Sequence, residues 1–132
     1  MSKSKKGGLR HNSGKPRVHL VPEEAIIAMA LGFMAGEKKY PKFNYRAGHS
    51  WLETSDSLRR HLYKWLQGED IDQESGVFHL QLVLTNAAML EYNRVHHPDL
   101  DDRYLKGKYN EIQKTKRKRN NSSKKQALGR RV

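Results

Sequence analysis

Acidic side chains and two histidines gather near the middle of the chain. The acids fall within six residues, one histidine precedes them and one follows: Glu69, Asp70, Asp72, Glu74, His61 and His79. Gly68 is expected to end one helix, because glycine is favoured just past a helix C-terminus, and Asp72 or Ser75 can cap the next. If the two helices fold back about residue 70, His61 and His79 come opposite each other. Carboxylates and imidazoles converging there could hold a divalent cation; an acidic, solvated turn is the alternative.

A second acidic pair lies earlier in the chain. Glu53 and Asp56 are three residues apart, so both carboxylates lie on one helix face and can point at one ion. Alternatively, Glu53 is only the capping-box partner of Ser50. Sixteen mostly helical residues separate Glu53 from Glu69, about 24 Å along a helix, so one ion cannot bind both acids within one chain. Either one cluster is structural, or an antiparallel partner chain brings the two together.

Positive and aromatic groups flank the acids. A triphosphate needs several cations, and arginine can bind it through two hydrogen bonds at once. The cationic candidates are Lys15, Arg17, Lys38, Lys39 and Arg60. Each can also be ordinary surface charge, and Lys38 suits the negative end of a helix. Tyr40, Tyr45 and Trp51 could each stack on a base or belong to the core. A hairpin about residue 70 places Asn86 near Glu53 and Asp56, as a substrate contact or a hydrogen-bonded core residue.

Three helices are expected to position these residues, at about 22–40, 51–67 and 75–95. Pro22 fits a first helical turn, and Pro41 disfavours helix at the residue before it. The first helix is apolar nearly all round, which predicts deep burial, and the third is broadly apolar, which predicts a central place. Residues 9–21 are expected to form an arm packed on the helices. Because the helices are too apolar for a lone three-helix unit, we expect an all-α bundle completed by oligomerisation, as a homodimer or homotetramer.

Charge divides the chain into parts. Its 132 residues allow one small domain, and the net charge of +12 belongs to the ends. Residues 11–95 hold ten basic and ten acidic side chains, whereas eleven Lys/Arg face one Glu from Lys106 onward. We expect a disordered basic arm at 1–8, an all-α domain at 9–98, and a linker with a disordered low-complexity basic tail at 99–132. A short helix at 104–113 is possible, and the tail could bind nucleic acid by neutralising phosphates.

The sequence lacks the features of membrane and exported proteins. The chain has no cysteine, so it offers no disulfide framework and no thiolate zinc site. No apolar run is long enough for a transmembrane helix, and no export signal follows the basic N-terminus. We therefore expect a cytoplasmic protein without a membrane partner.

Several short motifs occur together in a fixed order. They are Gly14-Lys15-Pro16-Arg17, Lys38-Lys39-Tyr40 with Asn44-Tyr45, Arg60-His61, Gly68-Glu69, Asp72, Glu74-Ser75-Gly76 and His79. Across residues 9–95 the chain thus resembles the phage dATP/dGTP diphosphohydrolases, a MazG-like group. The resemblance implies an all-α oligomeric enzyme that converts dGTP or dATP to the monophosphate and pyrophosphate with two or more Mg²⁺ or Mn²⁺ ions. In the phage setting, the dGMP would feed synthesis of 2-aminoadenine nucleotides.

The resemblance also indicates residue roles. MazG-like enzymes carry an E-x-x-E pair on one helix and an E-x-x-D pair on the next; here the third helix has no E-x-x-D pair, and His79 stands where an acid is expected. The expected catalytic and metal-binding acids are Glu53, Asp56, Glu69 and Asp72, with His61 and His79 as further metal ligands. The expected substrate-binding residues are Lys15, Arg17, Lys38, Lys39, Tyr40, Arg60 and Asn86. The alternative function is a small helical oligomer that binds nucleic acid through its basic tails.

Overall fold

Helices make up the regular secondary structure of this chain. The computed structural model describes residues 7–104 and 106–129, so residues 1–6 of the expected basic arm lie outside the described part. The helices are α1 (Glu23–Glu37), α2 (Trp51–Leu66), α3 (His79–His96) and α4 (Lys106–Gly129), with short 3-10 turns η1 (Val18–Leu20), η2 (Asn44–Ala47) and η3 (Pro98–Leu100). The predicted all-α class is confirmed. None of the described helices is long and apolar enough to cross a membrane.

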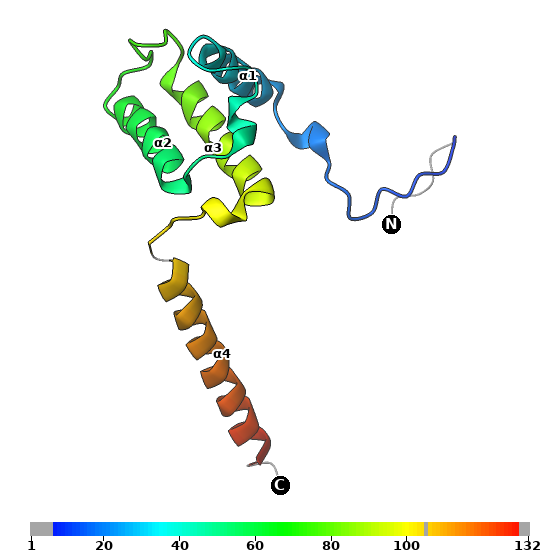
Figure 1. The fold of residues 1–132 in the computed structure, drawn as a ribbon. Coiled ribbons are helices and arrows are strands. Elements are labelled where there is room, and N and C mark those ends of the chain that lie inside the picture. Colours follow the sequence, from blue (N-terminus) through cyan, green and yellow to red (C-terminus); the bar gives the residue numbers. More distant parts are fainter. Residues whose placement is uncertain (1–6, 105, 130–132) are drawn as a thin grey trace.

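Helix α3 is the centre of the folded unit. It packs against α2 on one side and α1 on the other (Figure 1), so its predicted central place is confirmed. The approach to α1 is very close at Gly32, which is buried. A Cβ atom at this position would lie 1.8 Å from Thr85 Oγ1, so a side chain of any size is excluded here.

Two side chains from distant parts of the chain cap the start of α2. The Ser50 Oγ accepts a hydrogen bond from the backbone N–H of Glu53 at 3.1 Å, as the sequence predicts for an N-cap. The same hydroxyl donates to Asp102, whose Oδ1 also accepts from the backbone N–H of Leu52 at 3.0 Å. A carboxylate at the positive end of a helix is electrostatically favourable. The segment after η3 is therefore tied to the three-helix unit.

The turn between α2 and α3 is longer than predicted. Gly68, with φ of +93°, follows the end of α2 as expected, but α3 begins at His79 rather than near Ser75. Neither Asp72 nor Ser75 caps α3, so that prediction was wrong. The reason is that backbone hydrogen bonds close the turn on itself, from Asp72 N–H to Val77 O and from His79 N–H to Asp70 O.

Apolar residues of the single chain are poorly covered. No apolar side chain is buried among the described residues. In α1 the buried residue is Gly32. The predicted deep burial of α1 is therefore wrong for one chain, because α3 covers one side of α1 and leaves others open. The arm at 9–21 is exposed throughout rather than packed, since η1 stands apart from the helices (Figure 1).

The C-terminal segment forms a helix instead of the predicted disordered tail. Helix α4 covers 24 residues and projects away from the three-helix unit (Figure 1). This corrects the prediction of disorder for residues 106–129 of the tail, where the helix extends well beyond the short one expected at 104–113; residues 105 and 130–132 lie outside the described part. The physical reason is composition: between Gly107 and Gly129 there is no proline or glycine, and Lys, Arg, Gln and Ala have high helix propensity.

Candidate functional site

A cavity of about 720 Å³ opens between α1, η2, α2, α3 and the 68–78 turn. Its volume lies in the range typical of small-molecule sites. Six of the residues predicted from the sequence line it: Lys39, Tyr40, Arg60, His61, Asp72 and Asn86. The fold therefore brings together candidates that are up to 47 positions apart in the chain.

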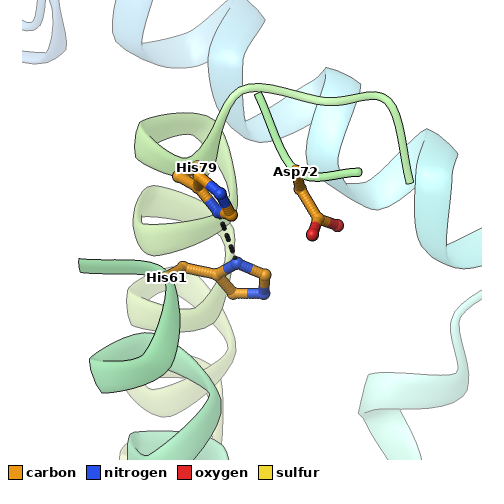
Figure 2. Close-up of side chains that lie close together, drawn as sticks. All are labelled: His61, Asp72 and His79. Carbon is orange, nitrogen blue, oxygen red and sulfur yellow. Dashed lines mark hydrogen bonds between the residues drawn. The ribbon is translucent and has the colours of Figure 1, made fainter. Parts of the chain in front are cut away.

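Three side chains with metal-binding atoms meet beside this cavity. His61 comes from the middle of α2, Asp72 from the turn and His79 from the first position of α3, as Figure 2 shows. One potential ligand atom from each lies within 4.8 Å of the other two. Asp72 and His79 are buried, and His61 is half-buried. The prediction that a hairpin would bring His61 and His79 face to face is confirmed, since their Nδ1 atoms are 2.9 Å apart.

Glu69 contacts the other nitrogen of the His79 ring. Its Oε2 is 2.9 Å from His79 Nε2. If Nε2–H donates to this carboxylate, Nδ1 of the neutral ring carries the free lone pair, and it faces His61. A carboxylate behind a histidine in this way fixes the tautomer and ring orientation that a metal ligand needs. Glu69 thus has the geometry of a positioning group, while its predicted role as a direct ligand stays a prediction.

Burial and hydrogen bonding set the protonation of the cluster. Burial lowers the pKa of His61 below its ordinary value, the positive charges of Arg60 and Lys64 act in the same direction, and Asp72 opposes them. Burial alone would raise the pKa of Asp72, but hydrogen bonds from the Ser75 hydroxyl and backbone N–H outweigh it and lower that pKa. A neutral imidazole and an ionised carboxylate are the forms that bind cations.

The donor set fits a divalent transition metal. One ring nitrogen from each histidine and one carboxylate oxygen of Asp72 lie within 4.8 Å of one another. Imidazole nitrogens favour Mn²⁺, Fe²⁺, Co²⁺ or Zn²⁺ over Mg²⁺, and the carboxylate of Asp72 suits all of them. The residues present therefore fit a cation at this position.

Lys39 and Arg60 supply positive charge at the cavity. Lys39 forms an ion pair with Glu74 across the opening, from the end of α1 to the turn, and this contact raises the pKa of Lys39. Arg60 precedes His61 on α2 and also lines the cavity. Its neighbour Arg59 is exposed and does not line it. Helical geometry thus separates two adjacent arginines that the sequence alone does not distinguish.

Asn86 occupies a position between core and cavity. It is buried, its Nδ2 donates to the backbone oxygen of Leu82 at 2.8 Å, and it lines the cavity. The amide oxygen faces no protein donor within hydrogen-bonding distance among the described residues. The two roles expected from the sequence, structural and substrate-binding, are therefore compatible.

Other predicted residues lie outside the cavity in this single chain. Glu53 and Asp56 are exposed on α2 and do not line it. Lys15, Arg17 and Lys38 are likewise exposed and do not line it. Their roles in catalysis, metal binding or substrate binding stay predictions, and for Glu53 and Asp56 both alternatives stand, a structural role or a site shared with a partner chain.

The cavity has an aromatic wall, of which the sequence predicted only Tyr45 as a ring that could stack on a base. Phe33, Phe43 and Tyr45 line it, and the rings of Phe33 and Tyr45 have centroids 5.0 Å apart. Phe43 has a φ of +61°, a conformation unusual for a side chain of this size. Such strain is often found at binding sites. Two aromatic residues on either side of an asparagine in one short loop, Phe43-Asn44-Tyr45, were the available signal.

Together the fold and the site define a small all-α protein whose cavity is lined by apolar, aromatic and charged side chains and lies beside a cluster of potential metal ligands. A family model described as "dATP/dGTP diphosphohydrolase, N-terminal" matches residues 5–103, and the chain belongs to this family. No curated protein and no solved structure matches the chain. The matched region includes the three-helix unit and Asp102, and it ends before α4.

Proposed function

We propose that this chain hydrolyses a purine deoxynucleoside triphosphate, dGTP or dATP, to the monophosphate and pyrophosphate. The family description supports the reaction class. The observation that carries the proposal is the shared cavity, in which metal-binding donors, cations and aromatic rings line one space of about 720 Å³. In a phage, the dGMP formed would feed synthesis of 2-aminoadenine nucleotides.

His61, Asp72 and His79 would hold a divalent cation, with Glu69 orienting His79. When bound, such a cation supplies positive charge that polarises phosphate oxygens and promotes ionisation of water. The two imidazoles favour Mn²⁺ over Mg²⁺ at this position. A second ion would require further carboxylates, and Glu53 and Asp56 of another chain are the candidates.

Arg60 and Lys39 would bind the phosphates. Arg60 can donate two parallel hydrogen bonds to one phosphate group, whereas Lys39 acts as a point charge. Because Lys39 is paired with Glu74 at the cavity opening, a phosphate has to replace this carboxylate. The ion pair would therefore keep the Lys39 side chain at the cavity in the absence of substrate. On binding, Lys39 would exchange the carboxylate of Glu74 for a phosphate.

The aromatic wall and the amide of Asn86 would contact the purine. Tyr40, Phe43 and Tyr45 offer ring faces on which a base can stack, a contact worth about 1–3 kcal/mol per base. Asn86 has one amide N–H engaged by Leu82 and retains an oxygen and a second N–H. An amide of this kind can discriminate between bases by hydrogen bonding.

A second copy of the chain would complete the apolar core. Among the described residues no apolar side chain is buried, and Ile26, Ile27, Leu31 and Met34 of α1 are exposed. A smaller hollow of about 340 Å³ lies beside α1, lined by Trp65, Phe78, Leu80 and Leu84 among others. Exposed apolar surface of this extent is typical of a protein interface. Light scattering of the purified chain should give the mass of a dimer or tetramer; a monomer contradicts this part of the proposal.

Product analysis tests the reaction. The full chain is incubated with each of the four deoxynucleoside triphosphates and Mn²⁺, and products are separated by anion exchange. We expect equal amounts of monophosphate and pyrophosphate from dGTP or dATP, and none from dCTP or dTTP. Asp72→Asn should abolish turnover, while Asp99→Asn, at an exposed position in η3, should not. Release of inorganic triphosphate, or no product from any nucleotide, would overturn the proposal.

A further inference from the structure

Helix α4 carries a dense and uniform positive charge. Eight lysines and arginines lie between Lys108 and Lys125, against the single acid Glu111. All eight are exposed, and no ion pair involves the cations from Lys114 to Lys125 within the described part of the chain. The family match ends at residue 103, so neither the proposed nucleotide chemistry nor the family accounts for this helix.

The charge is most concentrated at residues 114–119, which we call the basic segment. Five of its six residues are cationic: Lys114, Lys116, Arg117, Lys118 and Arg119. At 1.5 Å per residue they occupy about 9 Å of helix axis, or about one charge per 1.8 Å. Duplex DNA presents about one phosphate per 1.7 Å of its own axis. The two charge densities therefore match.

The helix lacks the features that other anionic partners require. An interfacial membrane helix needs an apolar face. Residues 114–126 cannot form one, because they include no Ala, Val, Leu, Ile or Phe. Single-stranded nucleic acids are bound through aromatic stacking, and the one aromatic residue of α4 is Tyr109. The narrow, deep major groove of duplex RNA excludes a helix, whereas that of B-form DNA, about 12 Å wide, admits one.

We propose that α4 binds duplex DNA through its phosphates, without reading base sequence, and so attaches the nucleotide-binding unit to DNA. Binding to DNA would also stabilise the helix of the basic segment. Like charges three and four residues apart, such as Lys114 with Arg117 and Lys118, repel one another along the helix. Phosphates on either side of a groove neutralise them, and the helix is stabilised in the complex.

Binding of the full chain to a fluorescent duplex of about 24 base pairs tests this proposal. With five phosphates neutralised, the logarithm of the affinity should fall with the logarithm of salt concentration with a slope of about −4.5. The matching loss between about 50 and 200 mM salt is several hundred-fold. A variant with all five cations replaced should lose at least ten-fold in affinity at low salt and most of the slope: Lys114→Gln, Lys116→Gln, Arg117→Gln, Lys118→Gln and Arg119→Gln.

Two comparisons make the outcome decisive. Glutamine has a helix propensity close to those of lysine and arginine, so circular dichroism should show that the variant keeps its helices. A charge-preserving variant, Lys114→Arg with Lys116→Arg and Lys118→Arg, should bind as the wild type does. Unchanged affinity of the glutamine variant would remove α4 from the binding surface. Equal or stronger competition by a duplex RNA or a single strand of the same length would overturn the assignment to duplex DNA. Neither result depends on whether the chain hydrolyses nucleotides.

Discussion

The Nδ1 atoms of His61 and His79 lie 2.9 Å apart and join the middle of α2 to the first residue of α3. This contact places two imidazoles at the base of the turn that carries Asp72, and Figure 2 shows all three side chains converging. Glu69, at the start of the same turn, holds the other nitrogen of His79. One turn between two helices thus supplies both a potential metal ligand, Asp72, and the carboxylate that contacts His79.

Replacing Glu69 by glutamine should weaken metal binding without removing a ligand of the cluster. Glutamine cannot match the charged acceptor that orients His79, and loss of such a partner weakens metal affinity about 10- to 100-fold. Mn²⁺ binding measured by electron paramagnetic resonance checks this. Asp70→Asn is the matched control, because it removes the charge of the neighbouring exposed carboxylate. Equal losses in both variants would mean that general electrostatics, and not orientation of His79, is responsible.

Acid should destabilise the chain through His61. Burial lowers the folded-state pKa of His61 below the ordinary value of 6.5, so the unfolded state binds the proton more tightly. Stability from the neutral ring is therefore complete above about pH 6.5 and is lost as the pH falls through the folded-state pKa. Urea unfolding between about pH 7.5 and 5 should show a decline that is smaller in His61→Gln. His11→Gln, on the exposed arm, should decline like the wild type; a wild-type slope in His61→Gln contradicts the assignment.

Two glycines of α1 should respond in opposite ways to alanine. Gly32→Ala places a Cβ 1.8 Å from Thr85 Oγ1, so α1 and α3 must separate, at a cost of about 1–3 kcal/mol. Gly36→Ala meets nothing within 4 Å and should stabilise the helix by about 0.5–1 kcal/mol. Thermal unfolding of both variants measures the difference. A Gly32→Ala protein as stable as the wild type would show that the two helices do not approach this closely.

Asp102 should contribute to stability although it lies beyond the last helix of the folded unit. It accepts hydrogen bonds from the Ser50 hydroxyl and the Leu52 N–H at the start of α2, and these bonds lower its pKa. Asp102→Ala should therefore reduce the melting temperature by several degrees, as loss of a helix cap does. Asp99→Ala, at an exposed position in η3, is the control. Matching melting temperatures for the two variants would show that the cap has no energetic weight.

The helices and the histidine pair were predictable because their signals are local. Ser50 followed by Glu53 marks the start of α2, and Gly68 marks its end, so the hairpin that brings His61 to His79 follows from chain geometry. The start of α3 was not predictable in this way. Hydrogen bonds from Asp72 N–H to Val77 O and from His79 N–H to Asp70 O close the turn and delay the start of α3, and no local residue preference indicates contacts of this kind.

The sequence does not indicate which helix faces pack together, so it could not predict which of the remaining candidate residues line the cavity. The sequence shows that α1 is apolar nearly all round, but it does not indicate which face of α1 is covered by α3. Glu53 and Asp56 lie three residues apart, as a metal-binding pair on one helix face would, but they are exposed and do not line the cavity of their own chain. Phe33 and Phe43 of the aromatic wall were missed because helix α1 and the η2 loop meet only in the folded structure.

Arg60 and Arg59 give the sharpest test of the proposed cavity. Both arginines are exposed, but Arg60 lines the cavity and Arg59 does not. Arg60→Gln removes a bidentate phosphate contact and should raise the KM for dGTP or dATP about 10- to 100-fold, since a hydrogen bond to a charged group contributes about 1.5–3 kcal/mol. Arg59→Gln changes the net charge equally and should leave KM within about two-fold. Steady-state kinetics with saturating Mn²⁺ separates the two outcomes. Equal increases would assign the effect to overall charge, and a rise in Arg59→Gln alone would place the phosphates on another face of α2.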